Sequence, residues 1–171
     1  MTSRFILPLH DCHDASLVGG KAVGLARLLA SGIDVPEGFC LTTEAYRLAL
    51  RALGFSATER WKQALGQVAE SRRLVLVECQ SMIRQVDISS LVKACAEEMQ
   101  RIGGLERRWA VRSSASNEDT GQASFAGLYR TELGVLPTEI GRVIKELWAS
   151  IWDERVVEYM TKAGPDDNPP A

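Results

Sequence analysis

Residues 56–103 constrain the fold most, because three apolar stripes with helical spacing follow one another there with few signals for strands. Ser56 and Glu59 have the spacing of a capping box before the first stripe, and the pair Gly103 and Gly104 ends the third. The stripes are Trp61, Ala64, Leu65 and Val68; Val75, Cys79, Met82 and Val86; and Ile88, Leu91, Val92, Cys95 and Met99. Residues 74–77 also fit a buried strand. The pattern predicts a helical insert over about 56–103.

Short strands and helices alternate on both sides of this insert. The first part of the chain predicts a helix over 21–31 ended by Gly32, extended pieces at 33–36 and 38–41, and a helix over 44–53 capped by Thr42 or Thr43. The last part predicts neighbouring strands over 109–112 and 129–135, an amphipathic helix after Pro137, a shorter helix over 153–162 and a linker-like tail over 164–171. This alternation indicates an α+β fold with a small mixed sheet.

The composition allows one ordinary soluble domain. The chain has 171 residues, of which 46% are hydrophobic and 25% charged. Its formal net charge of -2 argues against a general nucleic-acid binder, so any site for an anion must be local. The four cysteines form no CxxC pair, and we find no signal peptide or apolar run of membrane-spanning length. We therefore expect a cytoplasmic protein that contacts neither nucleic acid nor membrane.

The segment AVRSSASNEDTGQASFAG (110–127) has the chemistry of an anion site. Arg112 ends a short apolar run and supplies a permanent charge with planar donors. Ser113, Ser114 and Ser116 add hydroxyl groups that can donate to phosphate oxygens. Alternatively, Arg112 pairs with the carboxylate of Glu118 or Asp119, which requires no ligand.

A second basic element, GGKAVG (19–24), lies near the N-terminus. Gly19 and Gly20 form a flexible turn that delivers Lys21 and free amides to the start of a helix, where the helix dipole favours an anion. The segment is not a Walker A motif, because Ala15 and Ala22 stand where that motif requires glycine and serine or threonine. A solvated lysine at a helix start is the alternative interpretation.

Two other groups of residues invite functional interpretations that we do not favour. His10, Asp11, Cys12, His13 and Asp14 lack the second ligand pair of a closed zinc site, so we predict a surface loop and no metal site. Trp148 and Trp152 have helical spacing, and we expect them to belong to the core rather than to stack on a base.

Three blocks of the sequence carry a resemblance to a known family. They are LVGGKAVGLARL (17–28), IDVPEGFCLTTEAY (33–46) and AVRSSASNEDTGQASFAGLYRTELGV (110–135). In this order they resemble the N-terminal nucleotide-binding domain of phosphoenolpyruvate synthase and pyruvate phosphate dikinase. The resemblance implies that residues 1–171 are the N-terminal part of an ATP-grasp type domain.

The resemblance also implies roles for particular residues. Lys21 and Arg112 would contact the phosphates of ATP and act in catalysis, and Gly127 and Thr131 would line the same site. The magnesium ligands of the family would lie in a later half of the domain, outside this chain. Gly121, Leu128, Tyr129 and Arg130 depart from the family pattern, and Arg130 is either a further phosphate contact or an exposed strand arginine.

The implied activity is a kinase that passes a phosphoryl group from ATP to a histidine on a separate domain and then to an acceptor such as pyruvate. Neither His10 nor His13 resembles that histidine, so we expect this chain to bind ATP weakly and to be inactive alone. Its partners would be the phosphohistidine domain and the acceptor-binding domain. Two alternatives remain: the ATP-binding part of an antibiotic phosphotransferase such as the rifampin enzyme, or a nucleotide-binding module without catalysis.

Overall fold

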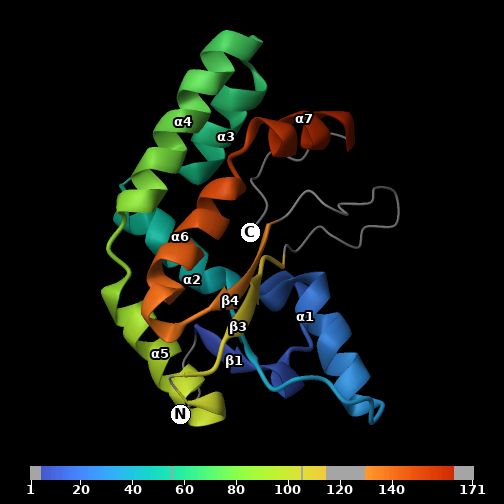
Figure 1. Ribbon diagram of the computed structural model, residues 1–171. Helices are drawn as coiled ribbons and strands as arrows, with labels where there is room; N and C mark the ends of the chain where they lie inside the picture. Colours follow the sequence, from blue (N-terminus) through green and yellow to red (C-terminus); the bar gives the residue numbers. More distant parts are fainter. Residues whose placement is uncertain (1–4, 55, 105, 115–129, 164–171) are drawn as a thin grey trace.

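The computed structural model describes residues 5–54, 56–104, 106–114 and 130–163, and Figure 1 shows their arrangement. In chain order the elements are β1 (Ile6–Pro8), the 3-10 helix η1 (Leu9–Asp11), α1 (Ala15–Ala30), β2 (Phe39–Leu41), α2 (Thr43–Ala52), α3 (Ala57–Leu65), α4 (Ala69–Gln85), α5 (Ser89–Gly103), β3 (Trp109–Arg112), β4 (Thr131–Val135), the 3-10 helix η2 (Pro137–Glu139), α6 (Ile140–Ser150) and α7 (Glu154–Ala163). The predicted tail over 164–171 lies outside the described residues.

The predicted helical insert is confirmed as the three helices α3, α4 and α5. The Oγ atom of Ser56 accepts a hydrogen bond of 3.2 Å from the backbone N–H of Glu59, so the predicted cap at the start of α3 is present. Residues 74–77 lie within α4 and are therefore helical, not a strand. Val68 was predicted to belong to the first apolar stripe, but its exposed fraction is 74%. The reason is that α3 ends at Leu65 and Val68 lies before α4.

The strands form two separate antiparallel pairs within an α+β fold, in place of one small mixed sheet. In the first pair, Leu7 of β1 lies opposite Cys40 of β2. In the second pair, which the sequence predicts, Arg112 of β3 lies opposite Thr131 of β4. Residues 33–38 belong to neither helix nor strand, so only the second of the two predicted extended pieces contains a strand.

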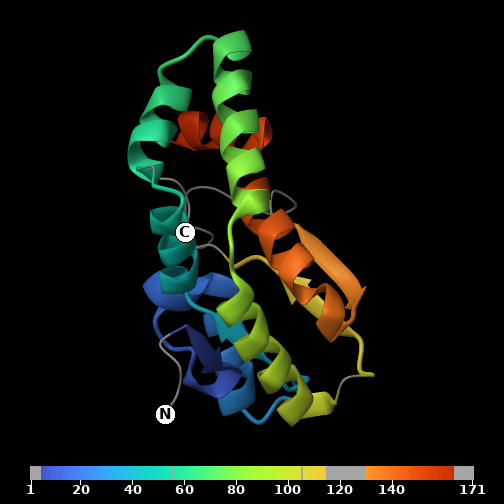
Figure 2. The same ribbon diagram turned by 90° about the vertical axis from the view of Figure 1, so that its left-hand side faces the viewer.

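The largest core lies between helices at one end of the molecule, where α7 crosses α3 and α4 (Figures 1 and 2). Trp61 and Trp152 meet there edge to face with ring centroids 5.6 Å apart, and both have exposed fractions of 0%. The Nε1 atom of Trp152 donates a buried hydrogen bond of 2.9 Å to Oη of Tyr46 on α2. The expectation that Trp152 belongs to the core is confirmed, and Trp148 packs half-buried against the same cluster.

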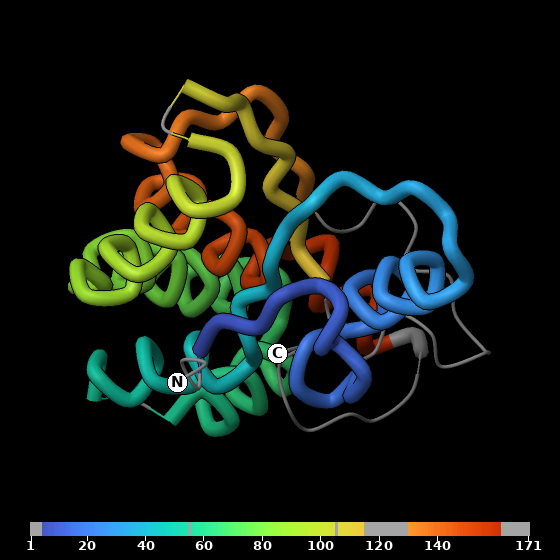
Figure 3. The backbone as a smooth tube through the Cα atoms, turned by 90° about the horizontal axis from the view of Figure 1, so that it is seen from below, coloured from blue at the N-terminus to red at the C-terminus, as the bar shows by residue number. Residues whose placement is uncertain are grey.

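The β3–β4 pair presents one face to α6 and leaves the other open. Val111 and Val135 pack against Val143 and Leu147 of α6. Arg112 follows Val111 directly in β3 and so points to the opposite face, where Thr131 lies across from it, and both are exposed. A register shift between Trp109 and Val111 accounts for Val135 lying on the face of Val111. Viewed from below, the connection from α1 to β2 forms a wide arch beside α1 (Figure 3). None of the described helices has the length and apolar character that a membrane span requires.

Candidate functional site

Two segments far apart in the sequence meet beside the open face of β3–β4. The ammonium Nζ of Lys21, on α1, donates a hydrogen bond of 3.2 Å to the carbonyl oxygen of Ser113, the residue that follows Arg112. The backbone N–H of Ala22 donates a hydrogen bond of 3.3 Å to Oγ of Ser114. The two basic segments that the sequence singles out are therefore neighbours in space.

Gly19 explains how α1 reaches this position. Its φ of 76° and ψ of 164° lie outside the helical region, so α1 has a break there and a second helical start just before Lys21. A side chain would strain this conformation, and a Cβ atom would lie 2.3 Å from the carbonyl oxygen of Ser114. The predicted glycine turn is thus present, and it is also the point of closest approach between α1 and the segment after β3.

Lys21 and Arg112 line one cavity with a volume of about 1090 Å³. Its described charged lining consists of Lys21, Arg107, Arg108 and Arg112 against one carboxylate, Glu37. The walls are otherwise mainly apolar and come from the arch, β2, β3 and α6. The cavity is therefore locally cationic although the whole chain carries a net charge of -2.

The four cations differ in how the protein engages them. The guanidinium of Arg107 lies 5.1 Å from the ring centroid of Trp109, and Arg108 donates a hydrogen bond of 3.0 Å to the carbonyl oxygen of Gly134. Among the residues that the structure describes, no carboxylate lies within ion-pair distance of Arg112. Among the described residues, no acceptor engages the guanidinium donors of Arg112 or Arg107, whereas Arg108 uses one donor on Gly134.

The structure brings together three of the four predicted site residues. Lys21 and Arg112 line the cavity, and Thr131 pairs with Arg112 across the strands. Gly127 lies outside the described residues, as do Glu118 and Asp119, the carboxylates considered as partners of Arg112. Arg130 forms an ion pair of 2.9 Å with Glu132, which favours the interpretation as an exposed strand arginine.

Two of the predicted hydroxyl donors have different partners. The Oγ atom of Ser113 donates 3.1 Å to the carbonyl oxygen of Arg130, and Oγ of Ser114 accepts from Ala22. The Ser113 hydroxyl therefore donates to an acceptor within the protein, whereas Ser114 keeps its own hydroxyl proton to donate, and Ser116 lies outside the described residues. That these hydroxyls donate to phosphate oxygens stays a prediction. Arg107 and Arg108 were not predicted as site residues, and the signal for them in the sequence is a basic pair directly before an apolar strand.

Two cysteines, Cys40 and Cys95, line the cavity, whereas Cys79 belongs to the core between the helices. Burial raises the pKa of the Cys95 thiol to about 12 and that of Cys79 to about 11, so both are neutral at pH 7. Cys12, in the His10 to Asp14 tract, has an exposed fraction of 0%, and its Sγ lies 3.3 Å from the carbonyl oxygen of Pro8. A thiol engaged inside the protein is not available as a surface metal ligand.

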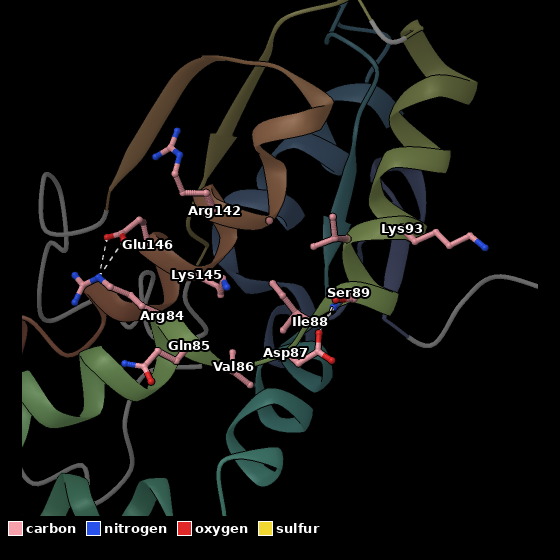
Figure 4. Close-up of a pocket in the computed structure, with 12 residues that line it drawn as sticks. Arg84, Gln85, Val86, Asp87, Ile88, Ser89, Lys93, Arg142, Lys145 and Glu146 are labelled. Carbon is pink, nitrogen blue, oxygen red and sulfur yellow. Dashed lines mark hydrogen bonds and ion pairs between the residues drawn. The ribbon is translucent and has the colours of Figure 1, made fainter.

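A second hollow of about 750 Å³ lies where the α4–α5 connection meets α6 (Figure 4). One ion pair and one local hydrogen bond lie among its polar groups. Nε of Arg84 donates to Glu146 at 3.0 Å, and Asp87 accepts from the hydroxyl of Ser89 at 2.6 Å, as the dashed lines in Figure 4 show. The first bond joins α4 to α6 and the second is local to the start of α5, and we assign no ligand to this hollow.

The fold and site define a class of protein: an α+β domain with a cationic cavity suited to an anionic ligand. Comparison with known families makes the class specific. Residues 15–170 match the family model described as pyruvate phosphate dikinase, AMP/ATP-binding domain. The chain belongs to this family.

Individual relatives agree with the family match. A rifampicin phosphotransferase of Bacillus cereus is 36% identical over 173 residues, covering 97% of this chain and 20% of the relative. A phosphoenolpyruvate synthase of Aeropyrum pernix is 38% identical over 172 residues, covering 93% of this chain and 21% of the relative. The phosphoenolpyruvate synthase of Pyrococcus furiosus is 31% identical over 209 residues, which cover 97% of this chain and 26% of the relative. The chain thus spans about a fifth to a quarter of these relatives.

Proposed function

We propose that this chain is the ATP-binding part of a phosphotransferase and that the triphosphate binds between Lys21 and Arg112. The observation that carries this proposal is the hydrogen bond of 3.2 Å from Nζ of Lys21 to the residue next to Arg112. It places both cations at one cavity although they are far apart in sequence. Thr131 lies beside Arg112 with its hydroxyl on the same face, and Gly127 completes the proposed set.

The two cations have complementary chemistry. Arg112 presents a planar fork that binds two phosphate oxygens together, whereas Lys21 supplies a compact charge at a helix start. Phosphoryl transfer depends mainly on positioning and on neutralising the charge that spreads over the phosphate oxygens. Lys21 and Arg112 would orient the triphosphate and stabilise that charge. The phosphoryl group would then pass to a histidine on another domain and from there to an acceptor.

The described part of the site holds few groups that could bind magnesium. The cavity lining includes one described carboxylate, Glu37, and no group of three His, Cys, Asp or Glu side chains in the described residues forms a candidate metal site. A magnesium ion bound with a nucleotide takes one or two carboxylates as well as phosphate oxygens. One carboxylate is the lower limit of that requirement, so we propose that the magnesium ligands of the family lie outside this chain.

The acceptor is pyruvate in our main proposal and an antibiotic such as rifampicin in the second. The second is favoured by relatives named rifampicin phosphotransferase, which are as similar to this chain as those named phosphoenolpyruvate synthase. The discriminating assay joins this chain to the remaining domains of each type of relative and measures ATP consumption with pyruvate and with rifampicin.

The phosphate site is tested by titrating ATP into the isotope-labelled chain and following amide signals by NMR, which detects weak binding. We expect Arg112→Ala to weaken binding about 10-fold to 100-fold, because a hydrogen bond to a charged group contributes about 1.5–3 kcal/mol. Arg130→Ala is the matched control, since it removes the same charge from an arginine that pairs with Glu132. Equal affinities of Arg112→Ala and the unmodified chain would contradict the proposal.

A further inference from the structure

We propose that Ser114 is a positioning residue that fixes the helical start at Lys21 against β3 and so sets the separation of the two phosphate-binding cations. The inference rests on the proposed function, because that function assigns Lys21 and Arg112 to the triphosphate. The side chain of Ser114 contacts neither Lys21 nor Arg112. Ser114 acts through the backbone of α1.

Three contacts converge on Ser113 and Ser114. Ala22 N–H donates to Oγ of Ser114 at 3.3 Å, and Nζ of Lys21 donates to the carbonyl oxygen of Ser113 at 3.2 Å. At Gly19, a Cβ atom would lie 2.3 Å from the carbonyl oxygen of Ser114 and 2.4 Å from its Oγ. Residues before, at and after Lys21 therefore all meet the two residues that follow Arg112.

The bond from Ala22 is significant because of its position in the helix. The break at Gly19 leaves the amides of the next turn without partners inside the helix. Such amides are normally satisfied by a capping side chain that lies directly before the helix. Here the cap for Ala22 comes from a residue 92 positions later in the chain, so the cap also fixes the position of the helix relative to β3.

The neighbouring serine has a different partner, which makes the pair a natural control. The hydroxyl of Ser113 donates to the carbonyl oxygen of Arg130 and so holds β3 to the start of β4. Only the backbone carbonyl of Ser113 contacts Lys21. Removal of the Ser113 hydroxyl therefore leaves every contact between α1 and the 113–114 segment in place, whereas removal of the Ser114 hydroxyl breaks one.

The experiment compares Ser114→Ala, Ser114→Thr and Ser113→Ala in the 171-residue chain, with two readouts. Hydrogen exchange at the Ala22 amide reports the capping bond, and titration with ATP reports the cation geometry. In Ser114→Ala we expect exchange at Ala22 to rise and ATP affinity to fall, each by about 2-fold to 10-fold, as for the loss of one neutral hydrogen bond. Ser114→Thr keeps the hydroxyl and restores both values, and Ser113→Ala changes neither.

The outcomes separate this inference from the proposed function. Unchanged exchange at Ala22 in Ser114→Ala overturns the positioning role. Reduced ATP affinity with unchanged exchange means that Ser114 contacts the phosphate directly and also overturns it, as does faster exchange with unchanged affinity. If Arg112→Ala weakens ATP binding while Ser114→Ala does not, the inference fails and the proposed function remains. If Arg112→Ala has no effect, the proposed function itself fails.

Discussion

The helical end of this domain and its cavity end are held together in different ways. The helical end, formed by α3, α4 and α7, has large aromatic side chains at its centre, with Trp61 and Trp152 both fully buried. In the cavity end, formed by α1, β1 and β2, the core contains small side chains such as Ala22, Val23 and Ala26. Its link to β3 includes hydrogen bonds between segments distant in sequence.

This difference separates stability from ligand geometry. Burial of large apolar side chains contributes most of the free energy of folding, so the helical end should dominate the stability of the chain. The contacts of Gly19, Lys21 and Ser114 are hydrogen bonds and one close backbone approach, and in our proposal they set where two cations lie. Changes at the two ends should therefore affect different measurements.

The largest effect is expected from Trp61→Ala. Truncation removes a fully buried ring and its edge-to-face contact with Trp152, which costs about 3–5 kcal/mol in the free energy of unfolding. Urea denaturation followed by circular dichroism measures this loss, and Trp61→Phe should lose clearly less. A cost near that of a surface substitution would mean that the helical end does not dominate stability.

Most of the fold could be predicted because its helices bury regular stripes. In residues 74–77, the buried pair Val75 and Leu76 lies between exposed Leu74 and Val77. That pattern suits a helix, but four apolar residues in a row do not reveal which are buried. Val68 was misplaced for the related reason that an apolar stripe does not show where a helix ends.

The site could be predicted only in part. The types and local settings of Lys21 and Arg112, together with the family resemblance, indicated phosphate binding. The capping of Ala22 by Ser114 spans 92 positions, and no local pattern encodes a contact at that distance. Serine can both cap a helix and donate to phosphate, so the residue type alone did not reveal the contact with Ala22.

The next largest effect is expected from Gly19→Ala, which tests the cavity end. Gly19 and Gly32 both have a φ of 76°, but a Cβ atom at Gly32 has nothing within 4 Å. Gly32→Ala should therefore cost only the backbone strain of about 1–2 kcal/mol. Gly19→Ala should cost more, since the new methyl group meets Ser114, and it should also weaken ATP binding. Chemical denaturation and ATP titration of both variants test this. Equal losses of stability and of ATP affinity in the two variants would mean that the close contact with Ser114 has no effect.

A smaller effect is expected from Tyr46→Phe at the helical end. The variant leaves the indole N–H of Trp152 buried without its acceptor, at a cost of about 1–3 kcal/mol. Burial raises the pKa of Tyr46 above its usual value, so the hydroxyl stays protonated at neutral pH. Thermal unfolding measures the stability loss, and an unchanged midpoint would contradict the prediction. Because Tyr46 also lines the cavity, this variant tests stability and is not a control for ATP affinity.

The smallest effect concerns the pH dependence of the two ends. Asp14 caps α1, and hydrogen bonds from the hydroxyl and amide of Ser16 lower the pKa of its carboxyl. Asp87 accepts the same pair of bonds from Ser89 at the start of α5, with the same direction of shift. Each carboxyl has a lower pKa in the folded chain than in the unfolded chain. The carboxylate therefore stabilises the fold fully at a pH above its unfolded pKa of about 3.9, and this stabilisation is lost as the pH falls through its pKa in the folded chain.

Asp14→Ala and Asp87→Ala should therefore each lower the midpoint of thermal unfolding at pH 7, and the difference from the unmodified chain should narrow at pH 2.5. Neither should change ATP affinity at pH 7. For Asp14, the break at Gly19 separates its cap from the helical start that carries Lys21. If Asp14→Ala weakened ATP binding while Asp87→Ala did not, the first turn of α1 would have to be counted with the phosphate site. The boundary between the part of the chain that stabilises the fold and the part that positions the cations would then lie before Gly19.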